Sequence, residues 1–307
     1  MKVLFVGIGS IGTRHLKNLC AVCKRRNIPL DITALRSSSR PLPQETAALL
    51  SHEITALDDT LYDLAFITNP TNLHHSAIAD LQGKANFFFI EKPIFEECVY
   101  SLDALNLTEK NAYVAAPMRY CGAYLKLKQL LQHKTGYSVR IICSSYLPGW
   151  RPDIDYRKNY SAIRAMGGGV TIDLIHELDY MVDLFGFPQE CYNFKGTYSN
   201  LELDSDDLSV YIARYKDKLC EVHLDYFGRT YRRSCEVFTK DGTITADFGL
   251  GIVTLPDGST IDCAEEVNLR FVREITNLLD IMAGRTDNPN PPEKANKVLA
   301  LTLGKEV

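Results

Sequence analysis

Short hydrophobic runs alternate with helical patterns through the first 115 residues of the chain. A run at residues 2–6 leads through a glycine-rich turn into a helical pattern at residues 13–24. The other strands predicted here cover residues 30–35, the surroundings of Ile54, 64–68, 86–90 and 112–115, and the other helices cover 44–50, a segment from His74 on, and a segment after residue 93. Buried strands alternating with helices are typical of a parallel sheet with helices on both faces. We therefore expect a doubly wound α/β domain over residues 1–119.

The second half of the chain is dominated by period-two patterns. Strands are predicted at residues 138–147, 192–198, 208–215, 219–226, 234–239, 243–248 and 251–255. Turn residues such as Asp241-Gly242 separate them, which is the signature of a meander. Apolar residues recur at helical steps over residues 170–185, and a final amphipathic helix is predicted at 266–283. We expect residues 120–307 to form a second domain.

The turn after the first strand reads Gly7-Ile-Gly9-Ser10-Ile11-Gly12. A GxGxxG motif between a buried strand and a helix is the fingerprint of dinucleotide binding. Gly7 permits the tight turn, Gly9 lets a pyrophosphate approach the backbone, and Gly12 lets helix and strand pack closely. The amides of the helix N-terminus, with Ser10 and Ile11, then face the phosphates.

The end of the second strand predicts which dinucleotide binds. NAD enzymes place an acidic residue there for the ribose hydroxyl, whereas this chain has Arg36-Ser37-Ser-Ser-Arg40. Guanidinium and hydroxyl groups fit a 2′-phosphate, so the sequence favours NADP over NAD. A solvated polar turn is the alternative interpretation.

Two later strands also end in polar residues at the edge where such sheets bind ligands. Asn69-Pro70 ends the strand at 64–68, and His74 opens the helix that follows. Glu91-Lys92-Pro93 ends the strand at 86–90. We expect Asn69, Pro70, His74, Glu91 and Lys92 to contact the cofactor, with Lys92 also taking part in proton transfer. A surface ion pair at a turn is the alternative for Glu91 and Lys92.

The segment GGGVTIDLIHELDYMVDLF at residues 167–185 carries the second candidate for catalysis. Its glycines allow the backbone to pass close to a ligand or another segment. On one continuous helix Asp173, His176 and Tyr180 share a face. A carboxylate beside an imidazole sets the tautomer and basicity of the histidine for proton transfer. The alternative is a buried helix in which the two side chains satisfy each other.

The loop before that helix is aromatic and charged. Aromatic faces with arginine and aspartate groups stack on, and hydrogen-bond to, a sugar ring. The predicted substrate-binding residues are Trp150, Arg151, Asp155, Tyr156, Arg157, Tyr160 and Arg164. An irregular surface connection is the alternative.

GIGSIG, NPTNLH, EKP and GGGVTIDLIHELDY, in this order, resemble the glucose–fructose oxidoreductase, inositol dehydrogenase and rhizopine-catabolism (Gfo/Idh/MocA) family. The resemblance implies a Rossmann domain followed by an α/β domain with a large, open, mostly antiparallel sheet. It implies that Lys92, Asp173 and His176 are catalytic, that Glu91 supports the cofactor side, and that the second sheet pairs subunits into a homodimer or homotetramer. Many relatives read D-x-G-x-H, whereas this chain reads Asp173-Leu-Ile-His176. The sequence leaves open whether Arg119, Arg232 and Arg233 reach the active site.

Charge and cysteine content exclude several other classes. The net charge of −4 gives no reason to expect a nucleic-acid partner. The longest apolar runs are too short for a bilayer, and no signal-peptide layout precedes the first strand. The nine cysteines are scattered, as in a reduced cytoplasm. Cys20 and Cys23 have core spacing, and neither they nor His74 and His75 complete a metal site, so we expect no metal.

The patterns and the resemblance together predict an NAD(P)-dependent oxidoreductase. It would transfer a hydride between nicotinamide and a hydroxyl or keto carbon of a sugar, sugar nucleotide or cyclitol. The tryptophan-containing loop and the H-E-x-D-Y run resemble enzymes of surface-polysaccharide sugar metabolism. The alternatives are a non-catalytic NADP-binding sensor and an NAD-dependent glycoside hydrolase of the same fold. Substrate identity and physiological direction stay open.

Overall fold

A six-stranded, wholly parallel sheet organises the N-terminal part of the protein in the computed structural model, which describes residues 1–37 and 40–305. The sheet order is β3-β2-β1-β4-β5-β6. Its strands are β1 (Lys2–Val6), β2 (Asp31–Leu35), β3 (His52–Ile54), β4 (Leu64–Ile67), β5 (Phe88–Ile90) and β6 (Ala112–Val114). The predicted Rossmann-type sheet is confirmed.

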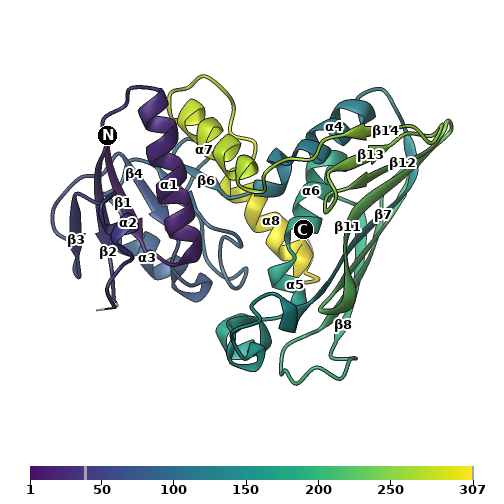
Figure 1. Ribbon diagram of the computed structural model, residues 1–307, viewed down its shortest axis with the longest axis horizontal. Coiled ribbons are helices and arrows are strands. Elements are labelled where there is room, and N and C mark those ends of the chain that lie inside the picture. The colour runs from purple at the N-terminus through teal and green to yellow at the C-terminus, as the bar shows by residue number, and fades with distance from the viewer. Residues whose placement is uncertain (38–39, 306–307) are drawn as a thin grey trace. The chain divides into compact units, whose positions relative to one another are not determined.

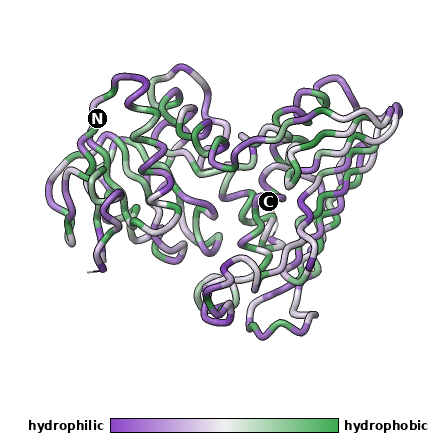
Figure 2. The backbone as a smooth tube through the Cα atoms, in the orientation of Figure 1, coloured by the Kyte–Doolittle hydropathy of each residue, from purple (hydrophilic) through white to green (hydrophobic). Residues whose placement is uncertain are grey.

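This sheet is buried because its strands are continuously apolar. All four residues of β4 are fully buried, and the rings of Phe5 and Phe66 stack with centroids 4.4 Å apart. Figure 2 shows hydrophobic segments inside this part of the molecule, flanked by hydrophilic ones. The helices nearby in sequence are α1 (Ser10–Arg25), α2 (Gln44–Ala47) and α3 (His74–Asp80). Between Pro93 and β6 the chain forms bends and turns, so the helix expected there is absent from the described residues.

The C-terminal helices correct the predicted domain division. The chain separates into an N-terminal unit, residues 1–116 with 271–299, and a C-terminal unit, residues 117–270 with those from 300 on. Helix α7 (Asn268–Met282) joins the N-terminal unit from Phe271 on, where Glu274 accepts hydrogen bonds from Tyr113 and from the Ala116 amide at 2.9 and 2.6 Å. A further helix, α8 (Pro292–Thr302), follows it, so α7 is not the final helix.

An eight-stranded, mostly antiparallel sheet forms the C-terminal unit, as the resemblance implied (Figure 1). Its order is β14-β13-β12-β11-β7-β10-β9-β8. The strands are β7 (Gly136–Tyr146), β8 (Glu190–Gly196), β9 (Leu208–Arg214), β10 (Leu219–Asp225), β11 (Phe227–Thr239), β12 (Gly242–Asp247), β13 (Ile252–Thr254) and β14 (Thr260–Asp262). Strand β7 pairs in parallel with β10 and so separates two antiparallel meanders.

Helices cover one face of this large sheet. Helix α4 (Gly122–Leu131) packs on β12 and β13, α5 (Val170–Asp173) on β9 and β10, and α6 (His176–Phe185) on β7. The strands alternate accordingly: Val139, Ile141 and Cys143 are buried, whereas Arg140 between them is exposed. Figure 2 shows this alternation along the long strands.

Candidate functional site

The glycine motif forms a tight strand-to-helix turn in the N-terminal unit. Gly7 has φ of +89°, and a Cβ on Gly12 would lie 2.5 Å from the Gly7 carbonyl oxygen. A Cβ on Gly9, by contrast, would meet nothing within 4 Å. The Thr68 hydroxyl donates to the Gly7 carbonyl at 2.6 Å and fixes the turn against the end of β4. Gly9 therefore opens a space before the first-turn amides of α1, from Ser10 and Ile11, as bound pyrophosphate requires.

Beyond β2 the predicted phosphate-binding arginine already has a carboxylate partner. Nη1 of Arg36 lies 2.5 Å from Oε2 of Glu53 on β3, and its Nη2 donates to the main-chain carbonyl of Arg40. Ser37 is exposed, and the two serines that follow it, at 38 and 39, lie outside the described residues. No motif in the sequence marks Glu53, because its partner Arg36, just after β2, is 17 residues away in the chain.

His74 is placed to brace the strand ends. It is buried, and its ring nitrogens lie 3.1 Å from the carbonyl oxygens of Ile94 and Asn69. Burial lowers the pKa of His74, so the neutral ring donates to one of these carbonyls. The Asn69 amide donates to the carbonyl of Leu73. These contacts tie Asn69-Pro70 to the segment after Lys92, and the cofactor contact of His74 stays a prediction.

Glu91 is held by a histidine that the sequence analysis did not single out. Nε2 of His15, on α1, lies 2.6 Å from Oε1 of Glu91, and Oε2 accepts from the Lys92 amide at 3.0 Å. His15 is fully buried among the rings of Phe66 and Phe89. Burial acts to raise the pKa of Glu91, but the hydrogen bond and charge of His15 and the charge of Lys92 outweigh it and lower that pKa. Glu91 therefore stays a carboxylate beside the half-buried Lys92.

In the C-terminal unit the segment at 170–185 is two helices, which corrects the expected single one. Helix α5 ends at Asp173 and α6 begins at His176, so the face that was to join them to Tyr180 does not form. Tyr180 is fully buried against Tyr124 and Phe248. His176 lies at the N-terminus of α6 and is partly exposed.

The glycines before α5 let the chain pass another segment. A Cβ on Gly168 would lie 2.0 Å from the Tyr160 carbonyl oxygen, and one on Gly169 would lie only slightly farther from the Asp206 carboxylate. Asp206 in turn accepts from the amide and hydroxyl of Thr171, at 2.9 and 2.6 Å, in the first turn of α5. From the sequence, these glycines were expected to pass close to a ligand or to another segment of the chain. In the structure they pass close to another segment.

Asp173 is hydrogen-bonded to a tyrosine that lies between β10 and β11. The fully buried Tyr226 donates its hydroxyl to Oδ2 of Asp173 at 2.6 Å. The Trp150 ring packs edge-on against Tyr226 with centroids 5.4 Å apart, and its Nε1 donates to Ser145. The pKa of Tyr160 is raised, first because its hydroxyl is desolvated and second because the negative charge of Asp173 is near. Tyr226 and the predicted loop residue Tyr160 thus lie near Asp173, and the predicted loop residue Trp150 packs on Tyr226.

The remaining loop residues bond elsewhere. Arg157 forms a two-pronged ion pair with Asp155, at 2.8 and 3.0 Å, and a third bond to Glu202. The Tyr156 hydroxyl accepts from the Glu202 amide, and Arg164 donates to the Asp204 carbonyl. These residues join the loop to residues 202–204, whereas Arg151 is among the groups near Tyr160.

Arg119 and Arg233, whose role the sequence left undecided, are bound to carboxylates of α6. Arg119 donates to both oxygens of Asp179, at 2.9 and 2.6 Å, and to Asp183 at 3.1 Å. Arg233, from β11, donates to both oxygens of Glu177, at 2.7 and 3.1 Å. The Arg233 pair fixes α6, which begins at His176, to the sheet, and the Arg119 pairs fix it to the turn at residues 117–120. Arg232 pairs with Ser144 in the β11–β7 register and is exposed.

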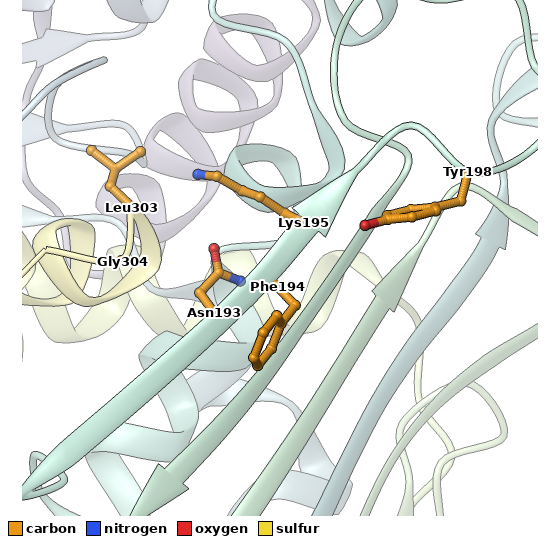
Figure 3. A pocket seen from close by; sticks show the side chains of 6 residues that line it. All are labelled: Asn193, Phe194, Lys195, Tyr198, Leu303 and Gly304. Carbon is orange, nitrogen blue, oxygen red and sulfur yellow. The ribbon is translucent and has the colours of Figure 1, made fainter.

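A hollow of about 350 Å³ lies at the edge strand β8, on the C-terminal unit. Figure 3 shows the six residues that line it, Asn193, Phe194, Lys195, Tyr198, Leu303 and Gly304. The predicted site residues are not among them. Within residues 1–37 and 40–305, no cluster of three or more His, Cys, Asp or Glu side chains is arranged to hold a metal ion. No helix in those same ranges has the length and apolarity to cross a bilayer.

Residues 1–116 match the family model described as "Oxidoreductase family, NAD-binding Rossmann fold" (GFO_IDH_MocA). This part of the chain is therefore similar to the Gfo/Idh/MocA oxidoreductases. The resemblance drawn from the sequence motifs is thereby confirmed, and the family is one that binds NAD. Comparison with curated protein sequences gives no match.

Solved structures share the fold over the whole chain. UDP-N-acetylglucosamine 3-dehydrogenase GnnA from Acidithiobacillus ferrooxidans is 19% identical, with a TM-score of 0.75 over 99% of this chain and 95% of that one. The WlbA dehydrogenase from Bordetella pertussis, in complex with NADH and UDP-GlcNAcA, is 15% identical, with a TM-score of 0.79 over 99% and 94%. A levoglucosan dehydrogenase in complex with NADH and levoglucosan is 17% identical, with a TM-score of 0.82 over 99% and 95%.

Proposed function

We propose that this protein is an NAD(P)-dependent dehydrogenase or reductase that acts on a hydroxyl or keto group of a sugar, sugar nucleotide or cyclitol. The observation that carries the proposal is the glycine turn of a NAD-binding family, with Glu91-Lys92 at a strand end of the same sheet. A sugar nucleotide is favoured because one structural neighbour is a UDP-N-acetylglucosamine 3-dehydrogenase and another is bound to UDP-GlcNAcA, and such a substrate supports a place in surface-polysaccharide sugar metabolism.

The residues divide the chemistry between them. A bound nicotinamide dinucleotide supplies or takes the hydride at the substrate carbon. Lys92 donates a hydrogen bond to the reacting oxygen, and His176 takes the hydroxyl proton during oxidation or returns it during reduction. Asp173, held by Tyr226, orients His176, while Trp150, Arg151 and Tyr160 bind the sugar. In oxidation the substrate carbon loses a hydride and its oxygen loses a proton to His176, which leaves C=O, and reduction adds both back, so the step is balanced in either direction.

The cofactor that we propose is NAD(P), with NADP supported by Arg36 and Arg40 and opposed by the Glu53 carboxylate that already bonds Arg36. The buried His74, which bonds the Asn69 carbonyl, supports the strand end that we propose to contact the cofactor. All nine cysteines are thiols rather than disulfides, which fits a reduced cytoplasm. We also propose a homodimer or homotetramer through the sheet face opposite the helices, where Tyr192 and Phe194 are 59% and 67% exposed. Light scattering of wild-type and Phe194→Asp protein tests this assembly.

Binding and turnover test the function separately. The fluorescence of NADH and NADPH gives their dissociation constants, and a panel of sugars, UDP-sugars and cyclitols is screened for absorbance change at the nicotinamide band. Lys92→Met and His176→Ala are expected to lower kcat at least ~100-fold, as loss of a general acid–base does, and to leave dinucleotide binding within about twofold. Full turnover by His176→Ala would refute its role. Binding without turnover favours the sensor, and hydrolysis without net NADH production favours the glycosidase.

A further inference from the structure

The ribose end of the proposed dinucleotide site contains a carboxylate on the strand next to β2. β2 and β3 run in parallel, with Ala34 opposite Glu53, and the Arg36 amide donates to the Ile54 carbonyl at 2.9 Å. Both strands therefore end at the same edge of the sheet as the glycine turn after β1. In doubly wound sheets this edge binds the ligand, and the end of β2 binds the ribose.

Glu53 forms an ion pair with Arg36, the arginine that would bind a 2′-phosphate. The ion pair between Nη1 of Arg36 and Oε2 of Glu53 is 2.5 Å long, and the Arg36 and Glu53 side chains are 15% and 43% exposed. The second terminal nitrogen of Arg36 donates to the Arg40 carbonyl. Both terminal nitrogens of the guanidinium are thus already bonded, and the Glu53 carboxylate beside it is exposed to solvent.

The two dinucleotides respond oppositely to this carboxylate. A 2′-phosphate carries nearly two negative charges and would be repelled by Glu53 while competing for Arg36. A 2′-hydroxyl can instead donate a hydrogen bond to a carboxylate, which is the contact that NAD-binding sheets place at this point. We infer that Glu53 is a specificity-determining residue, which opposes the 2′-phosphate of NADP and accepts the 2′-hydroxyl of NAD. This inference rests on the proposed dinucleotide binding, and it holds whichever cofactor the wild-type protein prefers.

Replacing Glu53 by glutamine tests the inference, because the amide keeps the size of the side chain and removes its charge. The dissociation constants of NADH and NADPH are measured for wild type, Glu53→Gln and Glu53→Ala. We expect the preference for NADPH over NADH to rise about tenfold in both variants, and the gain to shrink at high salt because Glu53 is partly exposed. Thermal unfolding curves confirm that each variant is folded.

Glu190→Gln is the matched control. Glu190 forms an exposed cross-strand pair with Arg214 between β8 and β9, in the other unit, so the variant makes the same change in net charge. Its NADPH:NADH ratio is expected to stay within twofold of wild type. An unchanged ratio in both Glu53 variants overturns the inference, and so does a fall, since a fall means that Glu53 orients Arg36 for the phosphate. If the wild-type protein binds neither dinucleotide, the proposed function itself fails.

Discussion

The buried ion pair between Glu177 and Arg233 offers a sharp test of how α6 is held. The Glu177 side chain is fully buried and both of its oxygens are bonded to the Arg233 guanidinium. Glu177→Gln keeps one acceptor oxygen and removes the counter-charge of the arginine. Arg233→Met leaves the carboxylate buried without its donors.

The expected cost follows from this burial. Removing one partner of a buried pair typically costs about 3–5 kcal/mol, because the remaining charge stays desolvated without compensation. Replacing both partners by hydrophobic residues of similar volume is often nearly neutral. We therefore expect each single variant to lose about 3 kcal/mol or more of unfolding free energy, and Glu177→Leu/Arg233→Met to lie within ~1 kcal/mol of wild type.

Urea unfolding followed by Trp150 emission measures this effect. Trp150 is the only tryptophan, and its packing on Tyr226 makes it a reporter of the C-terminal unit. Glu221→Gln is the control, since Glu221 pairs with Arg140 at 3.8 Å on the same sheet while both are about half exposed. Its cost should stay below about 1 kcal/mol. A loss under ~1 kcal/mol for Glu177→Gln would refute the reasoning.

Three further outcomes are expected. Tyr226→Phe removes the hydroxyl bonded to the buried Asp173, so the unfolding free energy of the C-terminal unit in urea should fall by about 1–3 kcal/mol. The kcat should also fall, while the affinity for NADH stays the same. An unchanged kcat would show that Asp173 takes no part in the reaction. Gly12→Ala puts a Cβ 2.5 Å from the Gly7 carbonyl, so NADH binding should fall strongly while the Trp150 transition stays, and a wild-type dissociation constant would contradict this. Burial acts to raise the pKa of Asp183, but Arg119, Lys128 and Tyr124 outweigh it and lower that pKa from its ordinary 3.8. The stabilisation by Asp183 is thus complete above pH 3.8 and is lost as the pH falls through the lowered folded-state pKa. Asp183→Asn should therefore lose less unfolding free energy than wild type as the pH falls below 3.8. Equal slopes of unfolding free energy against pH in the two proteins would contradict this assignment.

Local patterns in the sequence determined the framework of the protein. The glycine spacing after a buried strand predicted the β1–α1 turn, because the close approach of Gly12 to Gly7 leaves no room for a side chain. Continuous apolar runs predicted the parallel strands, and period-two runs predicted the meanders, since these patterns follow directly from burial on two faces or on one. The order of the motifs predicted the family.

Only the tertiary structure decided which distant groups meet. His15 and Glu91 are 76 residues apart in the chain, and Tyr226 lies 53 residues beyond Asp173, so no spacing rule could pair them. The break between Asp173 and His176 was equally hidden, because the apolar steps continue across it. Helix α7 joins the N-terminal unit through Glu274, whose partners at Tyr113 and Ala116 precede it by some 160 residues. Periodicity shows which face of an element is buried, whereas the partner on that face depends on the packing of the whole chain.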